Sequence, residues 1–341
     1  MSDQRHPGAR AVQSDVGLAV QTGPPPGGHG AAERGLMGRV LPYTQLAKLE
    51  FFDFYLSILV VWSLLPVTQR LAGENLLALS VFLIGEAGVV TAVMVFDDIT
   101  GYLDGSDRAN YLGERSGLRK LQRKPLLTGA LTLSQAKLFG YASLTWGVVV
   151  WGIGILVAPH RPPWAVLLIA LGIFTAVQYS WGIKFSYVGL GELLIAATPM
   201  IIVIAPYALV TGEITALVMT QALLFGLWQI LVSSYSNTND IEGDRTVGRS
   251  TVAARASKRG NRLFIGALTA LDFAIIGGSA ALGYTPWWFP LAMLPVMALR
   301  LRQFVGFASN GNALLARRRG VNVHRVGVGA LVLVNLVYLA N

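Results

Sequence analysis

Two short acidic clusters stand out because each follows a long stretch that carries almost no charge. The first lies in "FDDITGYLDGSD", residues 96–107, and the second lies in "NTNDIEGDRTVGRST", residues 237–251. In the second cluster Asp240 and Asp244 are four residues apart, so on a helix they share one face about one turn apart. Carboxylates stacked in this way repel each other, and a bound cation would remove the repulsion.

The residues in and around the clusters favour a magnesium ion that binds a diphosphate. The first cluster offers Asp97, Asp98, Asp104 and Asp107, and the chain has no cysteine. Proteins typically hold Mg²⁺ with one or two carboxylates plus substrate phosphates, whereas thiolates select other metals. Basic residues near both clusters could hold the remaining phosphate oxygens. They are Arg119, Arg123 and Lys124 after the first cluster, Arg245 and Arg249 in the second, and Lys184 between the two.

Each cluster alone is explained equally well as the solvated end of a membrane helix. Two clusters on the same side of the membrane, both accompanied by basic residues, favour the metal–diphosphate site. A hydrocarbon tail on that diphosphate would lie among the apolar helices. An isoprenyl diphosphate is a molecule of this kind.

The elements that position the clusters are predicted to be membrane helices. Of the 341 residues, 53% are hydrophobic and 13% are charged, and the mean hydropathy is +0.54. A soluble domain has about 25% charged residues, and about 20 apolar residues cross a bilayer. The sequence therefore predicts an all-α integral membrane protein with nine transmembrane helices. The expected spans are residues 47–69, 75–97, 134–158, 163–184, 188–211, 214–240, 262–283, 285–305 and 321–340.

The basic residues predict which side of the membrane the clusters face. If the N-terminus is cytoplasmic, Arg70, Lys137 and Arg161 are the only basic residues outside the cytoplasmic tail and loops. Cytoplasmic loops are enriched in Lys and Arg, so we expect a cytoplasmic N-terminus and both clusters at the cytoplasmic face of the cell membrane. Residues 1–38 are rich in Gly, Pro and polar residues, which predicts a disordered cytoplasmic tail. Residues 39–341 then form the membrane domain.

The second cluster and two further segments resemble the UbiA superfamily of intramembrane prenyltransferases, over nearly the whole chain after the tail. "NTNDIEGDRTVGRST" is similar to a motif of the 1,4-dihydroxy-2-naphthoate prenyltransferases, with Asn237, Asp240 and Asp244 at its polar positions. The segments "RKPLLTGALT", residues 123–132, and "YSWGIKFSYVGLGELL", residues 179–194, are similar to two other segments of that family. The resemblance implies the family's bundle of nine helices.

The first cluster departs from the family pattern at one position. Gly101 stands where the family has the central acid, and glycine has no side chain that could bind a metal. Asp104 is a nearby acid that could replace it, and Asp97 restores the number of acids. The departure favours an enzyme of specialised metabolism over a housekeeping role in menaquinone synthesis.

The resemblance implies Mg²⁺-dependent transfer of an isoprenyl group from an isoprenyl diphosphate to an aromatic acceptor within the membrane. Members of the superfamily also cyclise terpenes, so cyclisation of farnesyl or geranylgeranyl diphosphate is the alternative. The expected catalytic and metal-binding residues are Asp98, Asp104, Asp107, Asp240 and Asp244. The expected substrate-binding residues are Asn237, Arg123, Lys124, Lys184, Arg245 and Glu192.

Other acidic residues in the predicted spans leave two explanations open. Glu50 and Asp53 could orient an acceptor hydroxyl, or they could pair with a basic residue such as Lys48; Glu86 raises the same question. A membrane carrier is a third functional alternative, but the chain shows no convincing internal repeat of the kind many carriers have. The net charge of +9 is explained by basic cytoplasmic loops, so no nucleic-acid partner is predicted.

Overall fold

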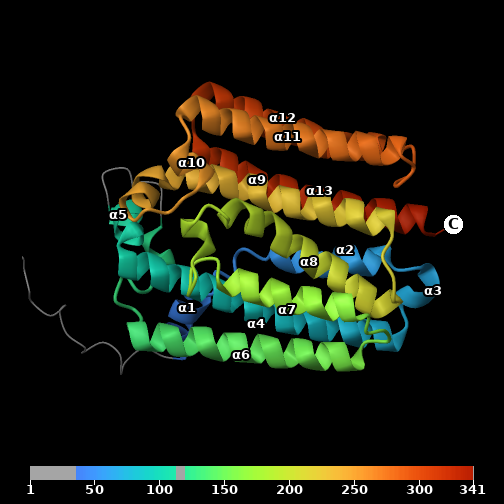
Figure 1. Cartoon of the computed structure of the whole chain (residues 1–341), viewed down its shortest axis with the longest axis horizontal. Coiled ribbons are helices and arrows are strands. Elements are labelled where there is room, and N and C mark those ends of the chain that lie inside the picture. The colour runs from blue at the N-terminus through green and yellow to red at the C-terminus, as the bar shows by residue number, and fades with distance from the viewer. Residues whose placement is uncertain (1–35, 113–119, 341) are drawn as a thin grey trace, which may run out of the picture. The chain divides into compact units, whose positions relative to one another are not determined.

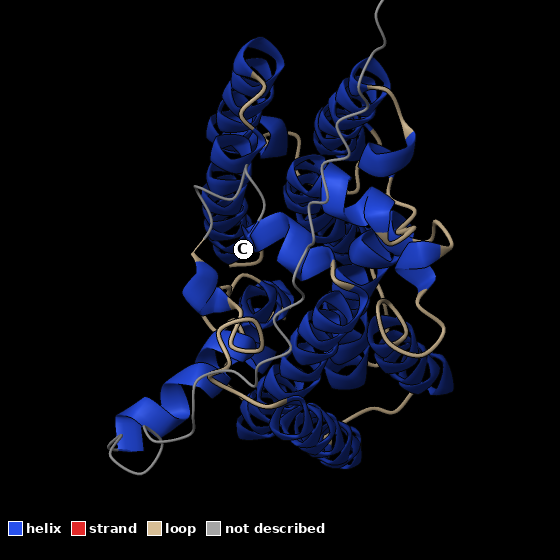
Figure 2. Cartoon of the chain, turned by 90° about the vertical axis from the view of Figure 1, so that its left-hand side faces the viewer, coloured by secondary structure: helices blue, strands red, loops and turns tan. Residues whose placement is uncertain are grey.

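The computed structural model describes residues 36–112 and 120–340, and this part of the chain consists of helices and loops without a strand (Figure 2). The predicted tail of residues 1–38 lies outside the described residues except for its last three, which begin a helix. The α-helices are α1 (Leu36–Leu46), α2 (Ser57–Leu64), α3 (Val67–Arg70), α4 (Gly73–Asp104), α5 (Ser106–Leu112), α6 (Leu133–Val157), α7 (Pro163–Val177), α8 (Gly191–Thr211), α9 (Ala216–Thr246), α10 (Val252–Arg255), α11 (Lys258–Ala281), α12 (Phe289–Asn310) and α13 (Ala313–Tyr338).

Seven of the described helices are long and apolar enough to cross a membrane, namely α4, α6, α8, α9, α11, α12 and α13. Two shorter apolar helices, Phe54–Leu64 and α7, lie in the predicted spans 47–69 and 163–184. The first of these spans is interrupted because Lys48 adopts a left-handed backbone with φ of 52° and because Pro66 follows the end of α2. The expected single helix is therefore replaced there by a 3-10 helix at Phe54–Leu56, by α2 and by the start of α3.

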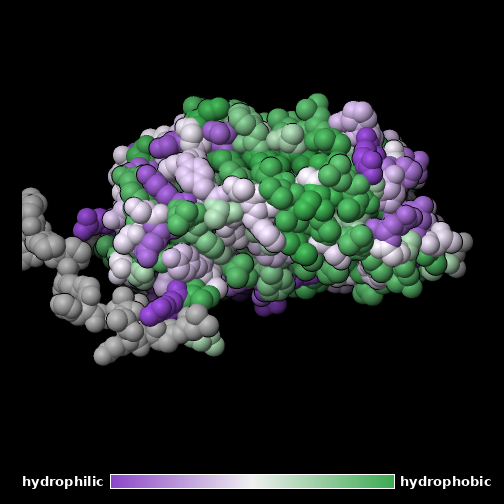
Figure 3. Space-filling model, turned by 90° about the horizontal axis from the view of Figure 1, so that it is seen from below, coloured by the Kyte–Doolittle hydropathy of each residue, from purple (hydrophilic) through white to green (hydrophobic). Residues whose placement is uncertain are grey.

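The surface confirms a multi-pass membrane protein. Large apolar side chains point away from the protein, such as Trp146 and Leu156 on α6 and Leu167 on α7. In the view of Figure 3, hydrophobic residues gather over the middle of the helices and hydrophilic residues gather toward their ends. A water-soluble protein rarely exposes apolar patches of this extent, whereas lipid tails solvate them.

The packing within residues 40–341 brings the ends of α4 and α9 together. The apolar window of α9 is 72% buried, the highest value among the candidate spans, because α8, α11 and α13 all pack against it. Helix α4 packs chiefly against α6 and also contacts α7 and α8. Helices α4 and α9 run in the same direction, so both acidic ends lie at the end of the bundle where α5 and α10 are found (Figure 1).

Candidate functional site

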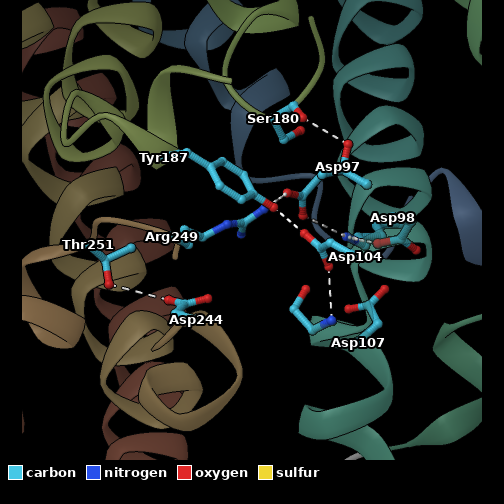
Figure 4. A network of polar contacts seen from close by, with 12 residues as sticks. Asp97, Asp98, Asp104, Asp107, Ser180, Tyr187, Asp244, Arg249 and Thr251 are labelled. Atoms are coloured by element: carbon cyan, nitrogen blue, oxygen red, sulfur yellow. Dashed lines mark hydrogen bonds and ion pairs between the residues drawn. The ribbon is translucent and has the colours of Figure 1, made fainter. Parts of the chain in front are cut away.

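Both long helices continue past the predicted ends of their spans and carry the acidic clusters in helical conformation. Helix α4 ends only at Gly105, whose φ of 85° lies in the left-handed region. The Asp104 carboxylate then accepts a hydrogen bond of 2.9 Å from the backbone N–H of Ser106, the first residue of α5. This tight junction turns α5 so that Asp107 faces back toward α4, as Figure 4 shows.

Two lysines hold the carboxylates of the first cluster. Lys48 and Lys124 each place their Nζ atom 2.7 Å from Oδ1 of Asp98. Lys124 is also 2.7 Å from the Asp107 carboxylate, so one ammonium group bridges two acids. Oδ2 of Asp98 is buried and has no hydrogen-bond partner in the described part of the chain.

Gly101 makes room for the Asp107 side chain. A Cβ atom at position 101 would lie 2.7 Å from Cγ of Asp107 and 2.9 Å from its Oδ2, closer than real Cβ contacts allow. The carboxylate of Asp107 therefore occupies space beside α4 that a side chain at position 101 would otherwise fill. Asp107, rather than Asp104, therefore lies next to position 101, where the family pattern has an acid.

Burial and neighbouring charges determine the protonation of Lys124 and Asp107. Burial lowers the pKa of Lys124, but the carboxylates of Asp98 and Asp107 outweigh it and hold the pKa well above its usual value. Lys124 therefore stays charged at neutral pH. Burial raises the pKa of Asp107 to about 6, against the opposing effect of Lys124 and with a further contribution from Asp98.

Arg249 connects the two clusters. Its guanidinium donates a hydrogen bond of 3.1 Å to Asp97 and lies 5.3 Å from the ring centre of Tyr187. Its backbone N–H donates to the carbonyl oxygen of Asp244 at 2.9 Å, which fixes the chain after α9 in a turn. The Tyr187 hydroxyl donates to the Asp104 carboxylate. In Figure 4, Arg249 lies between Asp97 and Tyr187 on one side and Asp244 on the other.

The second cluster is held by its own hydrogen bonds. The Thr251 hydroxyl donates to Oδ2 of Asp244 at 3.3 Å. Glu192, at the start of α8, accepts hydrogen bonds from the Asn237 side chain at 3.2 Å and from the backbone N–H of Val252 at 2.9 Å. Glu192 therefore ties the end of α9 to the segment that follows it.

Two cavities meet at these residues. A polar cavity of about 180 Å³ is lined by Asp107, Asp240 and Asp244 together with basic side chains. An apolar cavity of about 330 Å³ lies among α4, α7, α8, α9 and α13. Residues that line both are Lys48, Phe51, Asp97, Ser236, Asp240, Arg249 and Arg317. A charged compartment thus lies next to an apolar one, which is the arrangement that an amphiphile with an anionic head group requires.

A sequence model of the UbiA prenyltransferase family matches residues 56–323. The chain belongs to this family. It is 29% identical over 212 residues to the 1,4-dihydroxy-2-naphthoate octaprenyltransferase of Haemophilus influenzae, a match that covers 59% of this chain and 65% of that enzyme, just under two thirds of its length.

Solved structures of UbiA homologues share the fold. The homologue from Aeropyrum pernix superposes with a TM-score of 0.62 at 18% identity, over 84% of this chain and 98% of the other. The homologue from Archaeoglobus fulgidus bound to GPP and Mg²⁺ gives 0.61 at 14% identity, over 86% of this chain and 99% of the other. At these identities the likeness establishes the UbiA fold alone.

The predicted site residues of this UbiA family member fall into three groups. Asp107, Asp240, Asp244, Arg123 and Lys124 line the polar cavity, and Asn237 lines the apolar one. Asp98 lies beneath Lys48 and Lys124, while Asp104 and Glu192 hold neighbouring segments in place. Lys184 and Arg245, which are both described, line neither cavity. Lys184 lies 5.1 Å from the Tyr187 ring centre and Arg245 donates to the carbonyl of Ala254, so their contact with a diphosphate stays a prediction.

Some site residues were missing from the predicted set. Lys48 was expected at most to pair with Glu50 or Asp53, but it binds Asp98 instead. Glu50 pairs with Arg123, and Asp53 pairs with Arg325 at 2.6 Å. Pairing was one of the two explanations left open for both acids, although the partner differs. Arg249 was one of the basic residues that could hold phosphate oxygens, but it was not among the expected substrate-binding residues, and Arg317 carried no signal beyond its charge.

The oxygen donors fit a magnesium ion that arrives with a diphosphate. The free Oδ2 of Asp98 and the carboxylates on the polar cavity are hard oxygen ligands. Within the described residues, no three His, Cys, Asp or Glu side chains are grouped closely enough to hold a metal ion by themselves. Proteins commonly bind Mg²⁺ through one or two carboxylates with substrate phosphates completing the shell. These residues therefore fit a metal that is bound jointly by protein and substrate.

Replacing Gly101 by Ala is expected to reduce diphosphate binding as strongly as Asp107→Asn does. The new methyl group would overlap the Asp107 carboxylate, which must move away from Lys124. We expect each variant to weaken binding of a geranyl diphosphate analogue by about tenfold to hundredfold, the effect of one lost charged contact. Calorimetric titration measures this directly.

A double-mutant cycle supplies the control for this steric mechanism. In an Asp107→Ala background, where the side chain is short, Gly101→Ala should add almost no further loss. An equal loss in both backgrounds would show that Gly101 acts independently of Asp107.

Proposed function

We propose that this protein transfers an isoprenyl group from an isoprenyl diphosphate to an aromatic acceptor within the membrane, with Mg²⁺ bound to the diphosphate. The observation that carries the proposal is the polar cavity with acids from both helix ends, which adjoins an apolar cavity. The names of the relatives support it, because one is a 1,4-dihydroxy-2-naphthoate octaprenyltransferase and a structural neighbour is bound to GPP and Mg²⁺. We also propose nine membrane crossings, with α2 and α7 as the short ones, and a cytoplasmic N-terminus and active site.

The acids and bases of the polar cavity have separate tasks. Asp107, Asp240 and Asp244 on the polar cavity would hold Mg²⁺ together with the diphosphate, and Asp98, which is buried against Lys48 and Lys124 and lines neither cavity, would add its free Oδ2. When bound, Mg²⁺ neutralises charge on the diphosphate oxygens as the leaving group forms. Lys124 and Arg249 are fixed by their ion pairs before substrate arrives, so little reorganisation is needed when charge develops beside them.

The reaction exchanges one bond of the donor for a new carbon–carbon bond. The C1–O bond of the donor breaks and its electron pair leaves with the diphosphate. An electron-rich ring carbon of the acceptor bonds to C1, and that carbon then loses its proton. The walls of the apolar cavity exclude water from the allylic cation, so capture by water is suppressed.

Product analysis with and without an acceptor tests the proposal. Purified protein in detergent with Mg²⁺ would be given geranyl or farnesyl diphosphate, either alone or with 1,4-dihydroxy-2-naphthoate and a panel of phenols. We expect a prenylated aromatic compound only when an acceptor is present. A cyclic hydrocarbon or alcohol formed without an acceptor would show that the protein cyclises terpenes and would contradict the proposed transfer.

A further inference from the structure

Three of the polar side chains that line the apolar cavity away from the acidic clusters come from the long helices α4, α9 and α13. They are Glu86 on α4, Gln229 on α9 and His324 on α13, with exposed fractions of 2%, 7% and 1%. The Glu86 carboxylate accepts hydrogen bonds from the Ser57 hydroxyl at 3.0 and 3.3 Å. Nε2 of Gln229 and both ring nitrogens of His324 make no hydrogen bond of normal geometry with the described residues.

Two of these side chains lie at the same depth. Glu86 precedes Asp97 by eleven residues on α4, and Gln229 precedes Asp240 by eleven residues on α9. Eleven residues are close to three helical turns, so each pair lies on one face of its helix, roughly 16 Å apart along the axis. All four residues line the apolar cavity. The cavity therefore has an acidic mouth at one level and a polar floor at the other.

Tight packing closes the cavity at the level of this floor. One turn beyond Glu86 and Gln229, Phe82 and Phe225 belong to the main buried core and are almost completely inaccessible. The Trp151 indole donates a hydrogen bond of 2.8 Å to the carbonyl of Phe82 and lines the cavity beside it. A methyl group at Gly85 would overlap this indole ring, so the glycine lets Trp151 lie directly against α4.

We propose that the floor of Glu86, Gln229 and His324 limits the donor to two or three isoprene units, that is, to geranyl or farnesyl diphosphate. At the mouth, the metal and its oxygen ligands take up about 4 Å of the depth, from metal–oxygen distances near 2.1 Å on either side of the ion. About 12 Å remain along the helices. An extended isoprene repeat with carbon–carbon bonds near 1.5 Å is about 5 Å long, so two extended repeats fit this length and a third fits only if the tail bends.

The chemistry of the floor reinforces this steric limit. A longer tail would have to press hydrocarbon against a carboxylate and an unpaired amide and imidazole. Such contact keeps these groups from water or any other hydrogen-bond partner, at a cost in free energy. The inference rests on the proposed function for its reaction, but it concerns only how the donor binds.

Binding of non-reactive donors tests the limit. Thiolodiphosphate analogues with geranyl, farnesyl and geranylgeranyl tails would be titrated with Mg²⁺ into the full-length protein. We expect the geranylgeranyl analogue to bind about tenfold or more weakly than the farnesyl analogue, because its last unit cannot be buried. In Glu86→Ala, which removes the carboxylate and opens space, this ratio should fall about tenfold. Gln229→Ala provides a second variant with a shift in the same direction.

Glu74→Ala is the matched control, because Glu74 is an exposed acid in the first turn of the same helix and lines neither cavity. Its binding ratio should equal that of the wild type. Equal binding of all three tails by the wild type, or unchanged ratios in both floor variants, would overturn the inference. If the expected binding profile is found but no prenylated aromatic product forms with any acceptor, the proposed reaction fails and the floor stands.

Discussion

Replacing Asp98 by asparagine is expected to lower kcat/KM for the isoprenyl diphosphate by about 10³-fold or more, because metal binding and leaving-group stabilisation are both lost. The new side chain could still accept hydrogen bonds from Lys48 and Lys124 through its one oxygen, but an amide nitrogen that cannot bind a cation would replace the free Oδ2. The negative charge that Asp98 shares with both lysines would also disappear. Steady-state kinetics with labelled geranyl diphosphate measures the loss.

The same change of charge elsewhere on α4 is the control for Asp98→Asn. Glu74 lies at the opposite end of the helix, and the activity of the Glu74→Gln variant should stay within about twofold of wild type, as is usual for surface substitutions. Thermal unfolding in detergent would separate a folding defect from a catalytic one, since removing one partner of a buried ion pair is itself destabilising. A folded Asp98→Asn protein with activity near wild type would refute the role given to this carboxylate.

Replacing Arg249 by Met is expected to lower kcat by about 10²- to 10³-fold, the usual effect of losing one preorganised donor at a developing charge. Arg249 lines both cavities and contacts both Asp97 and Tyr187. Arg249→Lys should retain part of the activity, because it keeps the charge but not the planar fork that holds both contacts. The readout is single-turnover release of diphosphate.

Arg245→Met compares the neighbouring arginine under the same conditions. The Arg245 guanidinium donates to the carbonyl of Ala254 and the residue lines neither cavity, so we expect a loss of less than about tenfold. A loss in Arg245→Met as large as that in Arg249→Met would instead favour the sequence-based prediction that Arg245 holds the diphosphate.

Sequence patterns predicted the long helices because apolar periodicity and length are local properties. The acidic ends of α4 and α9 could also be expected at one end of the bundle, since the distribution of basic residues predicts the direction of each span. The first span was harder to predict. Its sequence is apolar enough for one helix, "LAKLEFFDFYLSILVVWSLLP", but the backbone turns at Lys48 and helix α2 ends before Pro66. Hydrophobicity alone does not report such turns.

The pairing of individual side chains depended on long-range geometry. Asp104 and Asp107 are equivalent candidates in the sequence, and only the left-handed turn at Gly105 directs Asp107 toward Lys124 and Asp104 toward Tyr187. In the sequence, Gly101 indicates that a metal ligand is missing. In the structure, the absence of a side chain at this position leaves the space that the Asp107 carboxylate occupies. The partners of Lys48 and Arg249 also depend on long-range geometry. Lys48 pairs with Asp98, 50 positions away in the chain, and Arg249 pairs with Asp97, 152 positions away.

The central claim is that acids from both helix ends bind divalent cations jointly with a diphosphate, and Mn²⁺ titration followed by electron paramagnetic resonance tests it most directly. With geranyl thiolodiphosphate present, the wild-type protein should bind about two Mn²⁺ ions, and without the analogue it should bind them only weakly. Asp98→Asn and Asp240→Asn should each abolish the analogue-dependent signal. If both variants bound Mn²⁺ and analogue like the wild type, the two acidic clusters would not form one metal–diphosphate site.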